Sequence, residues 1–259
     1  MKKISLLLLP LLLIFYSSQS QDIKGLYFDQ EIGIIEHLND TIPNNITLIN
    51  EQGEQVNFKD IIDKPTVLMF VYFRCPGICS PLMGGVAEVI SKSDMTLGKD
   101  YQVVTISFDP KETSELSIKK KKNYLSLIGQ QNPQGWQFFT SDSANIARVT
   151  SSVGFRYKRT GTEYLHAATI ILLSPQGKIT RYLNGTYFLP FEFKLAVIEA
   201  SKGQAGPTIN KILQFCYSFD PVGQTYVLNI TKIAAILIIS MGLLFFLTLQ
   251  LRKSKSRHK

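Results

Sequence analysis

Two apolar runs near the middle of the chain predict strands that are buried on both faces. Val67–Phe73 is an unbroken apolar run, and Tyr101–Phe108 is apolar over most of its length. Short runs rich in Val, Ile and Phe are typical of inner strands that helices cover on both sides. Segments with helical character follow each run, at Ser80–Ser91 and Glu112–Ile128. This alternation of strand and helix indicates an α/β domain.

Shorter patterns complete the predicted sheet and its helices. They are, in chain order, a hairpin of Ile46–Ile49 and Val56–Phe58, a strand Trp136–Phe139, a helix Ser143–Val153, a hairpin of Thr169–Leu173 and Lys178–Leu183, and a helix Phe191–Ser201. We expect Ser143 to cap the first of these helices and Gly203 to end the second. The predicted fold class is α/β, with a mixed central sheet flanked by helices.

Residues 1–20 predict a secretory signal peptide. They contain two lysines, then an apolar core from Ile4 to Phe15, then small residues before Gln21. This order of a basic, an apolar and a small-residue region is typical of a cleaved signal. An uncleaved anchor helix is the alternative, but Pro10 and the short apolar core disfavour it.

Residues 231–251 predict a transmembrane helix. The apolar part of this stretch would be about 28 Å long as a helix, close to the ~30 Å hydrocarbon core of a bilayer. The tail at 252–259 is densely basic, which is typical of a cytoplasmic flank. We therefore expect the domain at 44–202 outside the cytoplasm, on the periplasmic side of a bacterial membrane. An N-terminal segment at 21–43 precedes it, and a juxtamembrane extension at 203–230 follows it.

The charge of the chain reflects these ends. The formal net charge is +8 at pH 7, and the cations of the signal peptide and of the basic tail account for all but +1 of it. The basic balance therefore reports targeting and topology, and we expect no nucleic acid as a partner. The run Lys119–Lys122 is expected on a solvated helix face, with a basic docking patch as the alternative.

The candidate chemistry follows the first apolar run. Cys75 and Cys79 come directly after it, and Pro76 suits the first position of a helix. If the turn between the cysteines is helical, their spacing places both sulfurs on one face. His166 precedes the predicted strand Thr169–Leu173, and a histidine there is more often structural. If the cysteines lie at the end of an adjacent strand, His166 would complete a site of two sulfurs and one imidazole. Thiolates suit Cu(I), and an added imidazole suits Cu(II), whereas structural zinc sites usually take four ligands.

The motifs that carry these residues resemble the Sco/SenC family of copper-binding proteins. They are FRCPGIC after a buried strand, ISFDP at the end of the next strand, and a histidine before IILLSPQGKI. The resemblance runs from about Asn45 to about Ser201 and implies a membrane-anchored, thioredoxin-like domain. It implies that Cys75, Cys79 and His166 are the copper ligands.

The resemblance also implies partners and exposes departures from the family pattern. The implied partners are the copper-bearing subunit of cytochrome c oxidase, whose dinuclear copper centre the family helps to assemble, and other copper chaperones. Asp109 matches an acidic position near the site. Ser174 stands where the family usually has an acidic hairpin residue, and the membrane anchor is expected at the C-terminus, whereas many members carry it at the N-terminus.

Other functions for the same residues remain open. Cys75 and Cys79 would form a redox-active pair in a thiol–disulfide oxidoreductase that reduces cysteines of the oxidase or of other envelope proteins, because an oxidising compartment allows the pair to close. A peroxiredoxin-like peroxidase would use Arg74 and Ser80, but the loop lacks the Thr-x-x-Cys pattern of such enzymes. A copper sensor without an enzyme target is a further alternative.

Two more residues have open or minor roles. Cys216 is expected to be a juxtamembrane thiol, with an intermolecular disulfide or an extra copper ligand as alternatives. His37 is expected on the surface, because no ligand-like spacing surrounds it.

Overall fold

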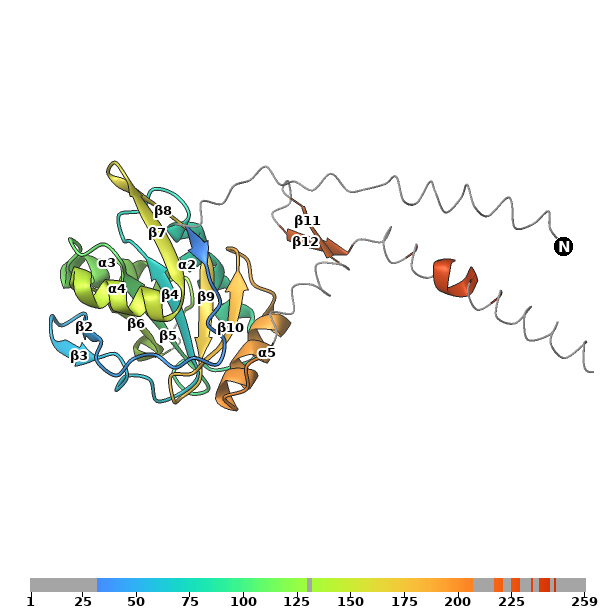
Figure 1. The fold of residues 1–259 in the computed structure, drawn as a ribbon, viewed down its shortest axis with the longest axis horizontal. Coiled ribbons are helices and arrows are strands. Elements are labelled where there is room, and N and C mark those ends of the chain that lie inside the picture. Colours follow the sequence, from blue (N-terminus) through green and yellow to red (C-terminus); the bar gives the residue numbers. More distant parts are fainter. Residues whose placement is uncertain are drawn as a thin grey trace, which may run out of the picture.

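A computed structural model describes residues 32–129, 132–206, 217–220, 225–228 and a few positions between 234 and 245 (Figure 1). The predicted signal peptide at 1–20, Cys216, the tail at 252–259 and most of 231–251 lie outside the described residues. Within the parts that are described, no helix combines the length and the apolar character needed to cross a membrane.

A five-stranded mixed sheet forms the centre of the fold, with the strand order β10-β9-β4-β5-β6. Its strands are β4 Thr66–Val71, β5 Gln102–Ser107, β6 Trp136–Phe139, β9 Thr169–Leu173 and β10 Ile179–Asn184. β4, β5 and β6 are parallel, while β9 runs antiparallel to both β4 and β10. Every residue of β4, β5 and β9 is buried, as expected for strands covered on both faces. The predicted mixed α/β sheet is confirmed.

Helices follow the strands as the sequence pattern predicts. They are α2 Cys79–Lys92, α3 Ser114–Leu125, α4 Ser143–Ser152 and α5 Pro190–Ser201. α2 packs against α3 and α5, and α5 also packs on β10. Because α2 follows β4 directly, its first turn lies at the carboxyl end of the parallel strands, where α/β proteins usually place their chemistry (Figure 1).

A second, three-stranded sheet was not predicted. It consists of β1 Gly33–Ile34, β7 Phe155–Thr160 and β8 Glu163–His166, all antiparallel. β7 and β8 form a hairpin that projects from the body of the domain (Figure 1). Only the first residue of β7 is buried, so the hairpin lacks the apolar run that identified the other strands. Its last residue is His166, for which the sequence predicts only a position before the strand Thr169–Leu173.

The described residues contain further short elements. They are the hairpin β2 Thr47–Ile49 and β3 Gln55–Asn57, which confirms the first predicted hairpin, the 3-10 helix η1 Pro133–Gly135, and the strand pair β11 Tyr217–Asp220 and β12 Thr225–Leu228.

The residue that caps α4 differs from the prediction. Asp142, not Ser143, precedes the helix, and its carboxylate accepts hydrogen bonds from the backbone N–H groups of Ala144 and Asn145 at 2.8 and 2.9 Å. Ser143 already has its place in the first helical turn, so its hydroxyl lies one position too late to cap. The stronger acceptor, one residue earlier, takes the role.

Two predictions about surface residues need adjustment. His37 is half-buried: its backbone N–H donates to the Tyr182 hydroxyl, and its ring Nδ1 lies 3.0 Å from the Ser152 carbonyl oxygen. Along the run Lys119–Lys122, Lys122 is exposed, but Lys121 pairs with Glu51 at 2.9 Å and both side chains are largely covered. The lysine run is thus a solvated face only in part.

Candidate metal centre

The three predicted ligands meet at one point. The Sγ atoms of Cys75 and Cys79 and a ring nitrogen of His166 all lie within 4.8 Å of one another. Cys79 Sγ is 3.2 Å from His166 Nε2, although the two residues are 87 positions apart in the chain. The loop after β4 and the first turn of α2 supply the sulfurs, and the end of β8 supplies the imidazole.

The start of α2 corrects one detail of the prediction. The helix begins at Cys79, and Pro76 lies in the preceding turn rather than at the first helical position. The turn is held because Cys75 Sγ accepts hydrogen bonds from the backbone N–H groups of Gly77 and Cys79, at 3.4 and 3.5 Å. Cys75 thus takes the place of a cap, and its sulfur faces the partial positive charge of the helix N-terminus.

Cys79 lies in a different environment. Its side chain is fully buried, and this burial raises the pKa of the Cys79 thiol, with further contributions from Cys75 and Glu112 nearby. Without a metal ion the thiol is therefore protonated at neutral pH. A soft cation that binds there must displace the proton, so binding at this sulfur releases H⁺.

His166 is held in the tautomer that a metal ligand needs. Its Nδ1 lies 2.9 Å from the Ala167 carbonyl oxygen. With the proton on Nδ1 as donor, the lone pair of Nε2 faces Cys79. The ring also lies among aromatic side chains, with centroid distances of 5.1 Å to Phe108 and 6.0 Å to Phe155. Burial lowers the pKa of His166, which keeps the imidazole neutral and ready to ligate.

The geometry fits a small ion with soft ligands. With metal–sulfur and metal–nitrogen bonds of about 2.3 and 2.0 Å, three donors around one ion lie about 4 Å apart. The observed limit of 4.8 Å requires only small side-chain movements. Two sulfurs and one imidazole match copper better than a hard cation, which prefers oxygen ligands.

Two residues beside the site were not identified from the sequence as part of it. Glu112 is buried and accepts hydrogen bonds from the backbone N–H groups of Phe73 and Arg74, immediately before Cys75. Tyr72 is buried against His166, with ring centroids 6.1 Å apart. Burial and the adjacent Cys75 raise the pKa of Tyr72 to about 12. The chemical type of Glu112 was visible in the sequence, but nothing there indicated its burial.

The remaining candidates lie around the site or away from it. Asp109 is half-buried, and its carboxylate accepts from the Lys111 N–H at 3.0 Å. Burial raises the pKa of nearby Tyr164, and the charge of Asp109 raises it further. The side chains of Arg74 and Ser80 are exposed. Ser174 follows β9 at the edge where β4 begins, far along the sheet from Cys75, and its hydroxyl braces the turn to β10.

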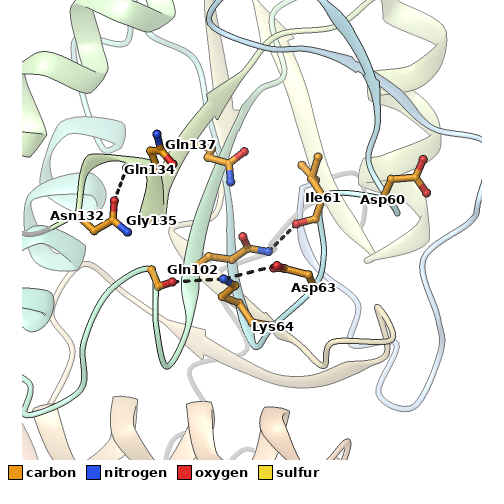
Figure 2. Close-up of a pocket in the computed structure, with 10 residues that line it drawn as sticks. Asp60, Ile61, Asp63, Lys64, Gln102, Asn132, Gln134, Gly135 and Gln137 are labelled. Carbon is orange, nitrogen blue, oxygen red and sulfur yellow. Dashed lines mark hydrogen bonds and ion pairs between the residues drawn. The ribbon is translucent and has the colours of Figure 1, made fainter.

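A polar cavity of about 310 Å³ lies at the amino ends of the parallel strands, the opposite end from the cysteines (Figure 2). Gln102, the first residue of β5, spans its wall and donates to the Ile61 carbonyl oxygen at 2.8 Å. Lys64 donates to the Gly98 carbonyl oxygen at 3.2 Å and lies 3.5 Å from Asp63. These groups tie the turns at the amino ends of the strands to one another. The cavity is remote from the Cys–Cys–His group.

The fold and the site together define a class of protein. A mixed α/β sheet of thioredoxin-like type carries two cysteines at the start of a helix, and a distant histidine faces them. A model of the SCO1/SenC family matches residues 36–198. The chain belongs to the SCO1/SenC family.

Relatives support this assignment. SCO1 homolog 1, a mitochondrial protein of Arabidopsis thaliana, is 28% identical over 143 residues. This match covers 52% of the chain and 40% of the Arabidopsis protein, so the chain spans less than half the length of that relative. A crystal structure from Aquifex aeolicus is 29% identical, with a TM-score of 0.58 over 64% of this chain and 95% of that one.

A third relative has been solved with copper. Bradyrhizobium japonicum ScoI, with copper bound, is 26% identical, with a TM-score of 0.47 over 62% of this chain and 98% of that one.

Proposed function

We propose that the chain binds copper through Cys75, Cys79 and His166 and acts as a copper chaperone in the assembly of the dinuclear copper centre of cytochrome c oxidase. The observation that carries the proposal is the convergence of two sulfurs and one imidazole nitrogen within 4.8 Å. Family membership supports it, because the match to the SCO1/SenC model at 36–198 spans all three residues. The ion is cargo, so the site must both hold it and release it.

The donor set suits both oxidation states of copper. Cu(I) is soft and needs little more than the two sulfurs, whereas Cu(II) favours the additional nitrogen. Loss of His166 should therefore weaken the binding of Cu(II) more than the binding of Cu(I). The site is also half open, since Cys75 is partly exposed while Cys79 is buried, which lets an acceptor's ligand approach from the side of Cys75.

We place the domain outside the cytoplasm, anchored by a helix at 231–251. The apolar sequence of this stretch and the basic tail at 252–259 support the proposal. Protease added to intact spheroplasts should digest the domain and leave a fragment near the C-terminus. A domain that survives this treatment whole would refute the orientation.

Thiol–disulfide exchange is the second candidate function. The observation that favours it is the closeness of two free thiols, one of them at a helix N-terminus. Exchange proceeds through a mixed disulfide at one thiolate, so it needs the two sulfurs and not the imidazole. Copper delivery needs all three groups.

His166→Ala tests the choice. The purified full-length chain should take up Cu(II) and develop a sulfur-to-copper charge-transfer absorption. The variant should lose stable Cu(II) binding and this absorption, retain weakened Cu(I) binding, and still form the Cys75–Cys79 disulfide. His37→Gln is the matched control, because His37 lies outside the Cys–Cys–His group, and it should behave like the unmodified chain.

The same variants extend the test to cells. In cells that depend on this chain for oxidase assembly, His166→Ala should lose oxidase activity, with partial rescue by added copper. Unaltered Cu(II) spectra and full oxidase activity in this variant would remove His166 from the site and favour thiol–disulfide exchange.

A further inference from the structure

A buried carboxylate lies directly behind the loop that carries Cys75. Glu112 is 5% exposed. Its Oε2 accepts hydrogen bonds from the Phe73 backbone N–H and from the Ser107 hydroxyl, both at 2.6 Å. Its Oε1 accepts from the Arg74 backbone N–H at 2.8 Å. One side chain thus joins the end of β5 to the last two residues before Cys75.

These hydrogen bonds satisfy groups that the sheet does not pair. β4 ends at Val71, and the chain then turns away, so the N–H groups of Phe73 and Arg74 lie beyond the ladder. A buried N–H without an acceptor costs about 1–3 kcal/mol. Glu112 supplies the acceptor for both. Ser107, which donates to Glu112, also accepts from the Asp109 N–H at 3.2 Å, so the same network holds the loop after β5.

The choice of an acid at this position is informative. The hydrogen-bond donors that face the carboxylate are neutral N–H and O–H groups. Burying a carboxylate among neutral donors is costly compared with an apolar side chain. A buried charge that breaks the usual rule of core packing beside a functional site indicates that the residue serves the site.

We propose that Glu112 is a positioning residue of the Cys–Cys–His site. Its carboxylate fixes the turn at Phe73 and Arg74 against β5, and this sets the location of the Cys75 sulfur relative to Cys79 and His166. The inference rests on the proposed copper function for its metal readout, and it deepens that function by adding a residue that does not touch the ion.

Glu112→Gln is the sharpest test, because the substitution keeps size and shape. An amide offers one acceptor oxygen where the carboxylate offers two. Whichever way the amide turns, its NH₂ group faces a backbone N–H of Phe73 or Arg74, and that hydrogen bond is lost. Supporting groups of this kind typically change metal affinity about tenfold or more. The full-length variant should therefore release Cu(I) to a chelator about tenfold faster, and its Cu(II) charge-transfer absorption should shift.

Two control variants distinguish the effect of the position of Glu112 from the effects of a lost charge and of lost stability. Glu115→Gln removes an equal charge at an exposed position in the first turn of α3 and should leave both copper readouts unchanged. Ser107→Ala removes one of the three hydrogen bonds to Glu112 but leaves both carboxylate oxygens as acceptors for the Phe73 and Arg74 N–H groups. It should change the copper readouts in the same direction as Glu112→Gln, by a smaller factor.

A metal-free measurement keeps the inference testable if copper binding fails. The equilibrium between the Cys75–Cys79 dithiol and its disulfide in a glutathione buffer depends on how well the two sulfurs are aligned. At pH 7, Glu112→Gln should lower the equilibrium constant for disulfide formation about tenfold, because small misplacements cost large factors in intramolecular reactions. A chain that takes up no copper refutes the proposed function. Copper release and disulfide equilibrium both within twofold of the unmodified chain would refute the role of Glu112.

Discussion

Replacing Phe108 should weaken the fold and the metal site together. Phe108 is fully buried beyond the end of β5. Its ring centroid lies 4.5 Å from Tyr157, 5.4 Å from Tyr164 and 5.1 Å from His166. The ring thus joins the central sheet to the projecting hairpin that ends in His166.

The expected magnitude follows from this burial. Truncating a buried phenylalanine to alanine typically costs about 3–5 kcal/mol, because apolar contacts are lost and a cavity remains. Aromatic pairs add about 0.5–1.5 kcal/mol each beyond their buried area. Phe108→Ala should therefore lower the free energy of unfolding towards the upper end of that range. Since the ring also packs against the imidazole, Cu(II) binding should weaken as well.

The assay needs two readouts and a matched control. Urea unfolding of the metal-free, full-length chain gives the free energy of unfolding, and titration with Cu(II) gives the affinity. Phe193→Ala is the control, because Phe193 is also fully buried and packs against Tyr101, 5.3 Å between centroids, near the start of β5. It should cost a similar free energy of unfolding but leave Cu(II) affinity unchanged. Equal losses of Cu(II) affinity in both variants would show that the aromatic contact does not position His166.

Three further changes have defined outcomes. Gly85→Ala would place a Cβ 1.8 Å from a backbone carbonyl oxygen in the loop after β10, so thermal unfolding should show a free energy of unfolding lower by about 1–3 kcal/mol. In the control Gly84→Ala the Cβ meets no atom within 4 Å, so this variant should be neutral or stabilising. Glu199→Gln weakens the ion pair of the buried Arg181, 2.8 Å away, and should lower the free energy of unfolding by up to about 3 kcal/mol in urea, an effect that should shrink little in high salt. Burial lowers the pKa of His166, so below about pH 6.5 the unfolded chain binds the proton before the folded chain does. The free energy of unfolding of the metal-free chain should therefore fall with falling pH, by at most about 1.4 kcal/mol per pH unit. His166→Gln should remove this component, and a pH profile that the substitution leaves unchanged would contradict the prediction.

The sequence predicted the elements that carry a strong apolar pattern. The inner strands were correct to within a few residues because their runs are long and are bounded by turn residues. The hairpin β7–β8 was missed because its side chains are mostly polar and exposed, so it contains no apolar run like those of the inner strands. The cap of α4 was misplaced by one residue because Asp142 and Ser143 are both good caps.

The candidate site divides in the same way. The pairing of Cys75 with Cys79 was predictable, because four residues at the start of a helix bring side chains to one face whatever surrounds them. The place of His166 was predicted only on the condition that the strand after it neighbours the strand before Cys75, and the family resemblance supported it, since no local rule brings residues 87 positions apart together. Glu112 was not assigned to the site from the sequence at all, because an acidic residue after a strand is usually exposed.

The sequence by itself determined what depends on neighbours along the chain: the buried strands, the helices between them, and the two sulfurs at a strand-to-helix turn. Only the tertiary structure decided which distant groups share a location. It brought the imidazole to the sulfurs, buried Cys79 enough to raise the pKa of its thiol, and enclosed Glu112 behind the loop. The physical reason is that burial and proximity depend on how the sheet and the hairpin pack against each other, whereas helix and strand formation follow the periodicity of the residues themselves.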